Sequence, residues 1–142
     1  MEALQTQIIK FIKEHHVLTL ATCVGEKVWC CNCFYAFLEK ETIFVFTSDP
    51  KTQHITEIKL NNKVAASIVL ETKIVGKIRG LQISGTVELA EDQLLHASKF
   101  AYLKRFPYAI LMDTTFWVLK PNFIKMTDNR LGFGKKLFWG QK

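Results

Sequence analysis

Seven short strand-like segments, each ended by a turn signal, constrain the fold of this chain more than any other feature. They are rich in β-branched and aromatic residues, which are typical of strands. Most are joined by hairpin turns such as Gly25-Glu26-Lys27, and hairpins connect antiparallel strands. The expected strands are residues 17–24, 28–38, 42–47, 64–70, 78–90, 115–119 and 123–127.

Three helical segments accompany these strands. Residues 1–15 carry a stripe of apolar side chains at helical spacing, formed by Leu4, Ile8, Phe11 and Ile12. The other two helices are expected after Pro50 and over residues 91–106. Together the segments predict a mainly β fold with flanking helices, in which an antiparallel sheet closes into a small split β-barrel.

The length of 142 residues is enough for a substantial core, so we expect a single domain over residues 1–142. No apolar run approaches the roughly 18–20 residues that a membrane span needs. The N-terminus also lacks the basic start and apolar core of a signal peptide. We therefore expect a cytoplasmic protein that does not contact a membrane.

Positive charge is concentrated in the second half of the chain. Residues 1–71 carry a net charge of −1, and residues 72–142 carry a net charge of +7. A basic half is compatible with an anionic cofactor, an acidic metabolite or nucleic acid, and equally with lysines that are simply solvated. Charge alone does not choose among these partners.

The C-terminal tail, residues 128–142, is both basic and aromatic. Its rings alternate with lysines along the chain, in the order Phe133, Lys135, Lys136, Phe138 and Trp139. Such a pattern suits stacking on single-stranded nucleic acid. These side chains are also too apolar to remain in water. We favour a tail at the interface of a homodimer, which makes nucleic acid the weaker hypothesis.

The four cysteines lie close together in the sequence, at Cys23, Cys30, Cys31 and Cys33. They lack the C-x-x-C spacing of a zinc or redox site, and no pair of histidines lies nearby at ligand spacing. In the cytoplasm such thiols stay reduced. We expect most of them to be small buried hydrophobic residues, with a reactive thiol as the alternative, and we expect no metal site.

Residues 42–62 combine a strand, a turn and the start of a helix. The turn collects hydroxyl groups and one cation at Thr47, Ser48, Lys51 and Thr52. Free amides and the helix dipole make such a junction a natural binding site for a phosphate. An ordinary capped turn with a solvated lysine is the alternative interpretation. His54, one turn into the helix, is expected at the surface.

Six stretches spread along nearly the whole chain carry a resemblance to a known family. They are residues 18–22, 29–35 (WCCNCFY), 51–54 (KTQH), 78–82 (IRGLQ), 104–107 (KRFP) and 127–136 (TDNRLGFGKK). These stretches resemble the YhbP family of small uncharacterised bacterial proteins. The chain also resembles, mainly through residues 42–62, the larger superfamily of pyridoxamine 5'-phosphate oxidase-like, FMN-binding split barrels, within which that family lies.

The resemblance implies a homodimer that binds FMN in the dimer cleft, with flavin-dependent oxidoreductase activity as the associated chemistry. It implies that the phosphate of FMN lies against Thr47, Ser48, Lys51 and Thr52, where hydroxyls donate hydrogen bonds and the lysine supplies charge. It also implies a glutamine near the isoalloxazine ring, for which Gln82 is the candidate. No residue is assigned a catalytic role, because the flavin itself carries the redox chemistry.

Residues 28–38 depart from the superfamily pattern because they contain no arginine. Typical flavin-binding members use an arginine there to clamp the phosphate through two parallel hydrogen bonds. Arg79 on a later strand is the candidate replacement, and it lines one site with Gln82 only if a bulge at Gly80 changes the register. The alternative function is a non-enzymatic binding module that has lost flavin and binds another small anionic or apolar ligand, such as a heme or a nucleotide.

Overall fold

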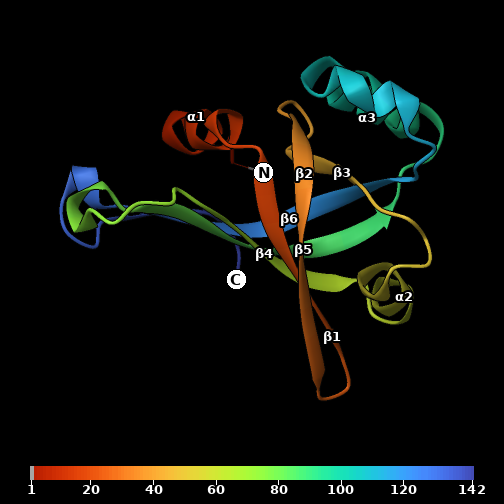
Figure 1. Ribbon diagram of the computed structural model, residues 1–142. Helices are drawn as coiled ribbons and strands as arrows, with labels where there is room; N and C mark the ends of the chain where they lie inside the picture. The colour runs from red at the N-terminus through yellow and green to blue at the C-terminus, as the bar shows by residue number, and fades with distance from the viewer. Residues whose placement is uncertain (1) are drawn as a thin grey trace.

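The strands form one antiparallel sheet that closes on itself, as the fold prediction requires (Figure 1). The computed structural model describes residues 2–142. Its strand order is β3-β2-β1-β4-β5-β6-β7, and β3 also pairs with β6, so β1 to β6 form a barrel that β7 extends. The strands are β1 Val17–Val24, β2 Lys27–Leu38, β3 Ile43–Thr47, β4 Lys63–Val69, β5 Arg79–Leu89, β6 Phe116–Asp128 and β7 Lys136–Gly140.

The expectation of two separate strands around Pro121 is wrong, because residues 116–128 form the single long strand β6. Its register against β5 shifts between Ser84 and Gly85, which places Asn122 as an extra residue on β6. A bulge is one of the few places inside a sheet that tolerates proline, since the ladder does not need a donor there. Gly85 allows the close approach, because a Cβ atom there would lie 2.9 Å from the Cα atom of Pro121.

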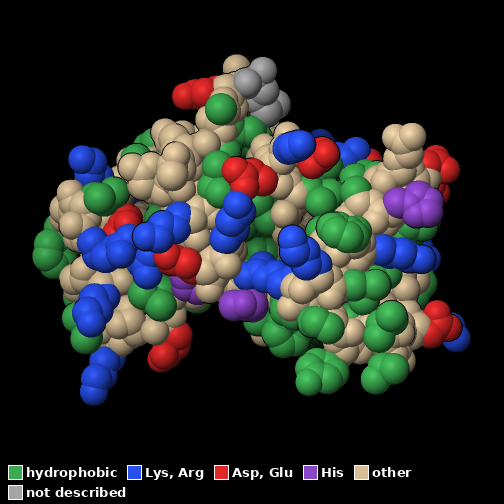
Figure 2. Space-filling model, turned by 90° about the horizontal axis from the view of Figure 1, so that it is seen from above, with side chains coloured by type: hydrophobic (Ala, Val, Ile, Leu, Met, Phe, Trp, Pro, Cys, Tyr) green, Lys and Arg blue, Asp and Glu red, His purple; other side chains and the backbone are tan. Residues whose placement is uncertain are grey.

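Three α-helices cover the barrel: α1 Thr6–Glu14, α2 Gln53–Leu60 and α3 Asp92–Arg105. Short 3₁₀ turns occupy Val75–Lys77 (η1), Pro107–Leu111 (η2) and Asn129–Leu131 (η3). Helices α1 and α3 lie on the same side of the barrel (Figure 1). A groove of about 1300 Å³ is lined by residues of α1, α3 and the β2–β3 hairpin. Lys and Arg side chains gather across this face, as Figure 2 shows from above.

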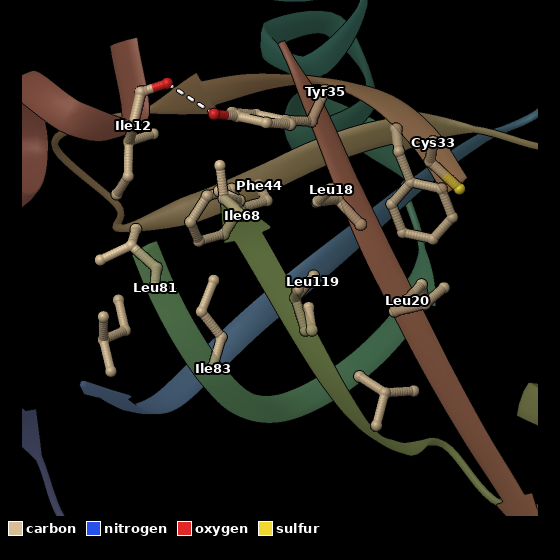
Figure 3. Close-up of a cluster of buried hydrophobic side chains, with 14 of the residues drawn as sticks. Ile12, Leu18, Leu20, Cys33, Tyr35, Phe44, Ile68, Leu81, Ile83 and Leu119 are labelled. Carbon is tan, nitrogen blue, oxygen red and sulfur yellow. Dashed lines mark hydrogen bonds between the residues drawn. The ribbon is translucent and has the colours of Figure 1, made fainter. Parts of the chain in front are cut away.

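The barrel interior is filled with apolar side chains. Leu18, Leu20, Tyr35 and Phe44 are completely buried and belong to one continuous cluster (Figure 3). The amphipathic face of α1 adds Ile8, Phe11 and Ile12, and α2 adds Ile55 and Ile58. Helix α1 leads into the start of β1. Helix α2 is hydrogen-bonded to the end of β1, because the Thr22 hydroxyl donates to Glu57 and the Asn61 side chain donates to the carbonyl oxygen of Cys23. The two helices therefore cover opposite ends of the barrel. Apolar side chains of both helices therefore extend the barrel core at its two ends.

Helix α3 covers only one part of the outer surface of the barrel. Helix α3 packs on the outer side of β3 and on parts of β2 and β6, where Tyr102 contacts Phe116 and a second apolar cluster forms. Apart from Lys63 at the start of β4, the outward residues of β1 and β4 are small or apolar, and Ala65 and Val69 of β4 are exposed. This uncovered region is called the outer face below, and it consists of the outward residues of β1, β4, β5 and neighbouring parts of β2 and β6. Of the helices in residues 2–142, none is long and apolar enough to cross a membrane.

The C-terminal tail completes the sheet of its own chain. Strand β7 pairs with β6, and Trp139 is buried while its indole N–H donates to the carbonyl oxygen of Glu2 at 2.7 Å. Leu137 packs against the barrel core, whereas Phe133 and Phe138 are exposed. A buried Trp139 cannot stack on a nucleic acid base. Its two exposed neighbours are the part of the tail that remains accessible to a partner.

Candidate functional site

The β3–α2 turn, residues 48–52, is held in place at both ends. The indole N–H of Trp117 donates to the carbonyl oxygen of Ser48 at 3.0 Å. The Ser48 hydroxyl lies 2.7 Å from Nε2 of His54, and the Thr52 hydroxyl lies 3.4 Å from the same atom. These contacts bring together two of the hydroxyl groups that the sequence analysis singled out. They also make His54 part of the turn: it is partly buried, so its expected surface position is wrong.

Asp49 turns its carboxylate toward the backbone of its own turn. Its Oδ1 accepts a hydrogen bond from the amide of Lys51 at 2.7 Å, and its carbonyl oxygen accepts from the Thr52 hydroxyl at 2.8 Å. The Lys51 side chain is exposed. The first amides of α2 have no acceptor inside the helix. An anion approaching this turn therefore meets the first amides of α2 and the ammonium group of Lys51, next to the exposed carboxylate of Asp49.

Thr47 points away from this turn. Successive side chains of a strand face opposite sides, so Thr47 faces α3 while Ser48 faces His54. The Thr47 hydroxyl lies 3.3 Å from the hydroxyl of Tyr102 on α3. Of the four turn residues predicted to hold a phosphate, the structure brings Ser48, Lys51 and Thr52 together and leaves Thr47 outside.

Arg79 and Gln82 do not share a site. Arg79 donates to Glu14 of α1 at 3.2 Å, and its guanidinium lies 5.4 Å from the ring centre of Phe11. It therefore closes the end of the barrel that α1 covers, away from the β3–α2 turn. Gln82 is exposed on the outer face. The register between β5 and β6 shifts between Ser84 and Gly85 and is regular at Gly80, so the change needed to bring Arg79 and Gln82 together does not occur.

A row of polar side chains crosses the outer face at the level of Gln82. Strand register pairs Gln82 with Ser67, Ser67 with Thr19, and Thr19 with Asn32. On the other side Gln82 pairs with Lys125. The Thr19 hydroxyl donates to the amide oxygen of Asn32 at 2.8 Å. The row supplies hydrogen-bonding groups across an otherwise small and apolar surface.

Two of the cysteines meet beside the same turn. Cys33 is buried in the barrel core, Cys31 packs against that core, and their sulfur atoms lie 3.8 Å apart. The hydrogen bond between the thiols, reinforced by burial, raises the pKa of Cys31. The same hydrogen bond, together with one from Ser48, lowers the pKa of Cys33.

The ring of His54 completes this cluster. The two sulfur atoms and a ring nitrogen of His54 all lie within 4.8 Å of one another. Sequence spacing missed the group because His54 follows Cys33 across β3 and the whole β3–α2 turn. Side chains alternate in direction along β2, which puts Cys31 and Cys33 on one face and Cys30 on the other. This alternation was the one sequence signal that pointed to the cluster. Cys33 is the one buried cysteine, Cys23 and Cys31 are partly buried and Cys30 is exposed, so the expectation that most of the cysteines are buried is wrong.

Comparison with known proteins identifies the family. No family model matches the chain. It is 41% identical over 134 residues to a UPF0306 protein of Photorhabdus laumondii, a match that covers 94% of each chain. It is also 34% identical to a UPF0306 protein of Yersinia pseudotuberculosis, with 94% of this chain and 91% of that relative covered. The chain belongs to the UPF0306 family.

Solved structures place this UPF0306 member among split-barrel folds. It superposes on a heme binding protein from Mycobacterium smegmatis with a TM-score of 0.78 and 17% identity, over 97% of this chain and 60% of that one. HutZ, the heme storage protein from Vibrio cholerae, gives a TM-score of 0.70 at 17% identity, with 84% and 91% covered.

An FAD-binding protein from Mesorhizobium loti gives a TM-score of 0.70 at 13% identity, with 88% and 95% covered. At these identities the likeness shows the fold alone, and it confirms the predicted antiparallel split barrel. Neighbours of this fold include proteins described as binding heme and proteins described as binding a flavin.

Proposed function

We propose that this UPF0306 protein binds FMN, with the phosphate held at the β3–α2 turn by Ser48, Lys51 and Thr52. The observation that carries the proposal is the geometry of this turn. The exposed Lys51 stands beside the first amides of α2, which have no acceptor inside the helix, and the Asp49 carboxylate in the same turn is hydrogen-bonded to the Lys51 amide at 2.7 Å. A dianionic phosphate is well matched to such a helix start.

The isoalloxazine ring would lie along the outer face, near Gln82 and its polar row. Two copies of the chain would enclose it, which makes the protein a homodimer with the cofactor in the dimer cleft. The small outward residues of β1 and β4 and the exposed Phe133 and Phe138 of the tail support this arrangement, since each leaves apolar surface to be covered. The proposal retains the resemblance to the YhbP family and a cytoplasmic location.

When bound, the flavin supplies hydride or electron transfer, and the chain's own residues bind and orient it. Flavin-dependent oxidoreductase activity would require a substrate to reach the exposed edge of the ring. Arg79 is left out of the binding site because Glu14 and Phe11 hold it at the other end of the barrel.

The proposal is tested with protein purified without added cofactor. Its absorbance spectrum is recorded for a flavin band, and FMN is then titrated while flavin fluorescence quenching is followed. Binding in the micromolar range is expected. Lys51→Ala is expected to weaken it by about tenfold, the scale of one charge-assisted hydrogen bond. Lys59→Ala, an exposed lysine in the last turn of the same helix, is the matched control.

No binding at tens of micromolar FMN would overturn the flavin assignment. An unchanged affinity in Lys51→Ala would place the phosphate elsewhere.

The second candidate is a binding module without flavin. Its support is that β2 presents Cys31 and Cys33 toward the turn and has no arginine along its length. Two solved structures with this fold are described as a heme binding protein and a heme storage protein. The same purified protein is therefore titrated with hemin. A stoichiometric absorbance change with hemin, and none of the quenching expected with FMN, would select this candidate.

A further inference from the structure

We propose that Cys31, Cys33 and His54 form a zinc-binding site in which the two thiolates and one imidazole nitrogen are the protein ligands. This inference goes beyond the flavin proposal, because it needs neither FMN nor a second chain. It rests on three side chains from two elements whose ligand atoms converge: Cys31 and Cys33 on β2, and His54 on α2.

The distances already resemble those of a bound site. Two thiolates on a tetrahedral zinc ion, each about 2.3 Å from the metal, lie roughly 3.8 Å apart. The sulfur atoms of Cys31 and Cys33 are separated by 3.8 Å. The ring nitrogen of His54 lies within 4.8 Å of both sulfur atoms, and a sulfur–nitrogen separation of about 3.6 Å is expected for two ligands of one tetrahedral zinc ion.

The surroundings hold the ligands in this arrangement. Cys33 is anchored in the barrel core, and Cys31 packs against that core. The hydroxyls of Ser48 and Thr52 lie 2.7 and 3.4 Å from Nε2 of His54 and so restrict the orientation of the ring. Groups that contact a metal-binding histidine in this way are a common part of zinc sites. Cys31 is partly exposed, which gives an ion a route from solvent.

The ligand chemistry selects the metal. Thiolates and imidazole favour zinc over magnesium or calcium, which prefer oxygen ligands. Binding releases the two thiol protons to solvent, and the two negative charges are balanced by Zn²⁺. Three protein ligands leave the fourth position of a tetrahedral ion for water or an incoming ligand. The site therefore has the ligand number of an open zinc centre.

The test uses zinc itself. The full chain is stripped with a chelator, kept reduced with a phosphine, and titrated with Zn²⁺ in competition with a colorimetric chelator, without flavin. One zinc ion per chain is expected. Co²⁺ in place of Zn²⁺ is expected to give thiolate-to-metal charge-transfer absorption. Cys31→Ser and Cys33→Ser should each weaken zinc binding by at least about 100-fold, more than substitutions outside the ligand set usually do.

Cys30→Ser is the matched control, because Cys30 lies on the same strand, is exposed and faces the other way. It should bind zinc within about twofold of the original protein. His54→Gln should lose affinity and shift the Co²⁺ spectrum, while Ser48→Ala should weaken binding by about tenfold. Circular dichroism of each variant separates ligand loss from misfolding, and the less buried Cys31 gives the decisive variant if Cys33→Ser does not fold.

Equal zinc affinity in Cys31→Ser, an equal loss in Cys30→Ser, or no one-to-one binding at micromolar zinc would each overturn the site. These outcomes are distinct from failure of the flavin proposal, because the zinc titration is read in the absence of FMN. The Lys51→Ala test, in turn, leaves all three zinc ligands in place.

Discussion

Asp128 is buried at the end of β6, where its carboxylate accepts three hydrogen bonds from Arg130. The amide and Nε of Arg130 reach Oδ1 at 3.0 and 3.1 Å, and Nη2 reaches Oδ2 at 3.0 Å. The Arg130 side-chain hydrogen bonds hold the pKa of Asp128 below its ordinary value. The Asp128 carboxylate thus stabilises the turn that connects β6 to β7.

This pairing predicts a specific acid sensitivity. A carboxyl whose pKa is lowered by folding stabilises the fold above its unfolded pKa, near 4, and that contribution is lost as pH falls through its folded pKa. Asp128→Asn should lower the free energy of unfolding at pH 7 by about 2 kcal/mol. In this variant the free energy of unfolding should also fall less steeply as the pH drops below 4. Urea denaturation at several pH values measures both effects. Asp113→Asn, at an exposed aspartate, should change neither.

Gly85 gives a second prediction at this scale. A Cβ atom there would clash with the backbone of Lys120 and lie 2.9 Å from the Cα atom of Pro121. Gly85→Ala should therefore destabilise the protein by about 2–3 kcal/mol, because backbone atoms cannot move aside cheaply. Thermal unfolding followed by circular dichroism provides the measurement. Gly76→Ala, where a Cβ meets no atom within 4 Å, is the control, and equal melting temperatures for both variants would contradict the argument.

Among the elements, α3 is tied to the rest of the fold by Arg105 in its last turn. The guanidinium donates to the carbonyl oxygens of Tyr35 at 2.9 Å and Lys13 at 3.1 Å, and also to that of His15. It lies 5.1 Å from the ring centre of Tyr35. The helix is thereby joined to β2 and to the segment that follows α1.

Replacing this guanidinium should loosen α3 without unfolding the barrel. Arg105→Lys keeps the charge and loses the forked donor geometry, so we expect a loss of about 1–3 kcal/mol in the free energy of unfolding. Hydrogen exchange should increase in α3 more than in β4 and β5. Lys104→Gln, at an exposed neighbour, is the comparison. Unchanged exchange in α3 would show that its apolar contacts alone hold it.

At the scale of the whole molecule, the outer face is the surface that the single chain leaves uncovered. Ala65 lies near its centre, paired in register with Ala21 on β1 and Ser84 on β5. Small outward side chains on three adjacent strands permit close approach of a second sheet. In the homodimer proposed above, this is where the two copies meet.

Ala65→Arg should therefore shift the protein from dimer to monomer, because a large cation would be buried between the copies. Light scattering after size-exclusion chromatography gives the mass, and circular dichroism is expected to stay unchanged since Ala65 is exposed in the single chain. Gln93→Arg, on the exposed surface of α3, should leave the mass of the dimer intact. A monomeric original protein, or a dimer that survives Ala65→Arg, would rule out this interface.

Local patterns were sufficient for most of the architecture. Alternation and turn residues located the strands, and apolar periodicity located α1 and α3, because both depend on neighbouring residues. The same local reasoning identified Ser48, Lys51 and Thr52 at a strand-to-helix junction. It divided β6 in two at Pro121, because a proline usually indicates a strand end, whereas here a bulge at Asn122 of the same strand accommodates it.

By itself, then, the sequence determined which segments are strands and helices and where a hydroxyl-rich turn meets a helix start. Only the tertiary structure decided which faces meet. Because of barrel closure and strand register, Arg79 pairs with Glu14 and does not lie near Gln82. For the same reason Thr47 faces α3, and His54 lies beside Cys31 and Cys33. The physical reason is that spacing along the chain specifies a side chain's direction on its own element, whereas its contacts depend on how distant elements pack against one another.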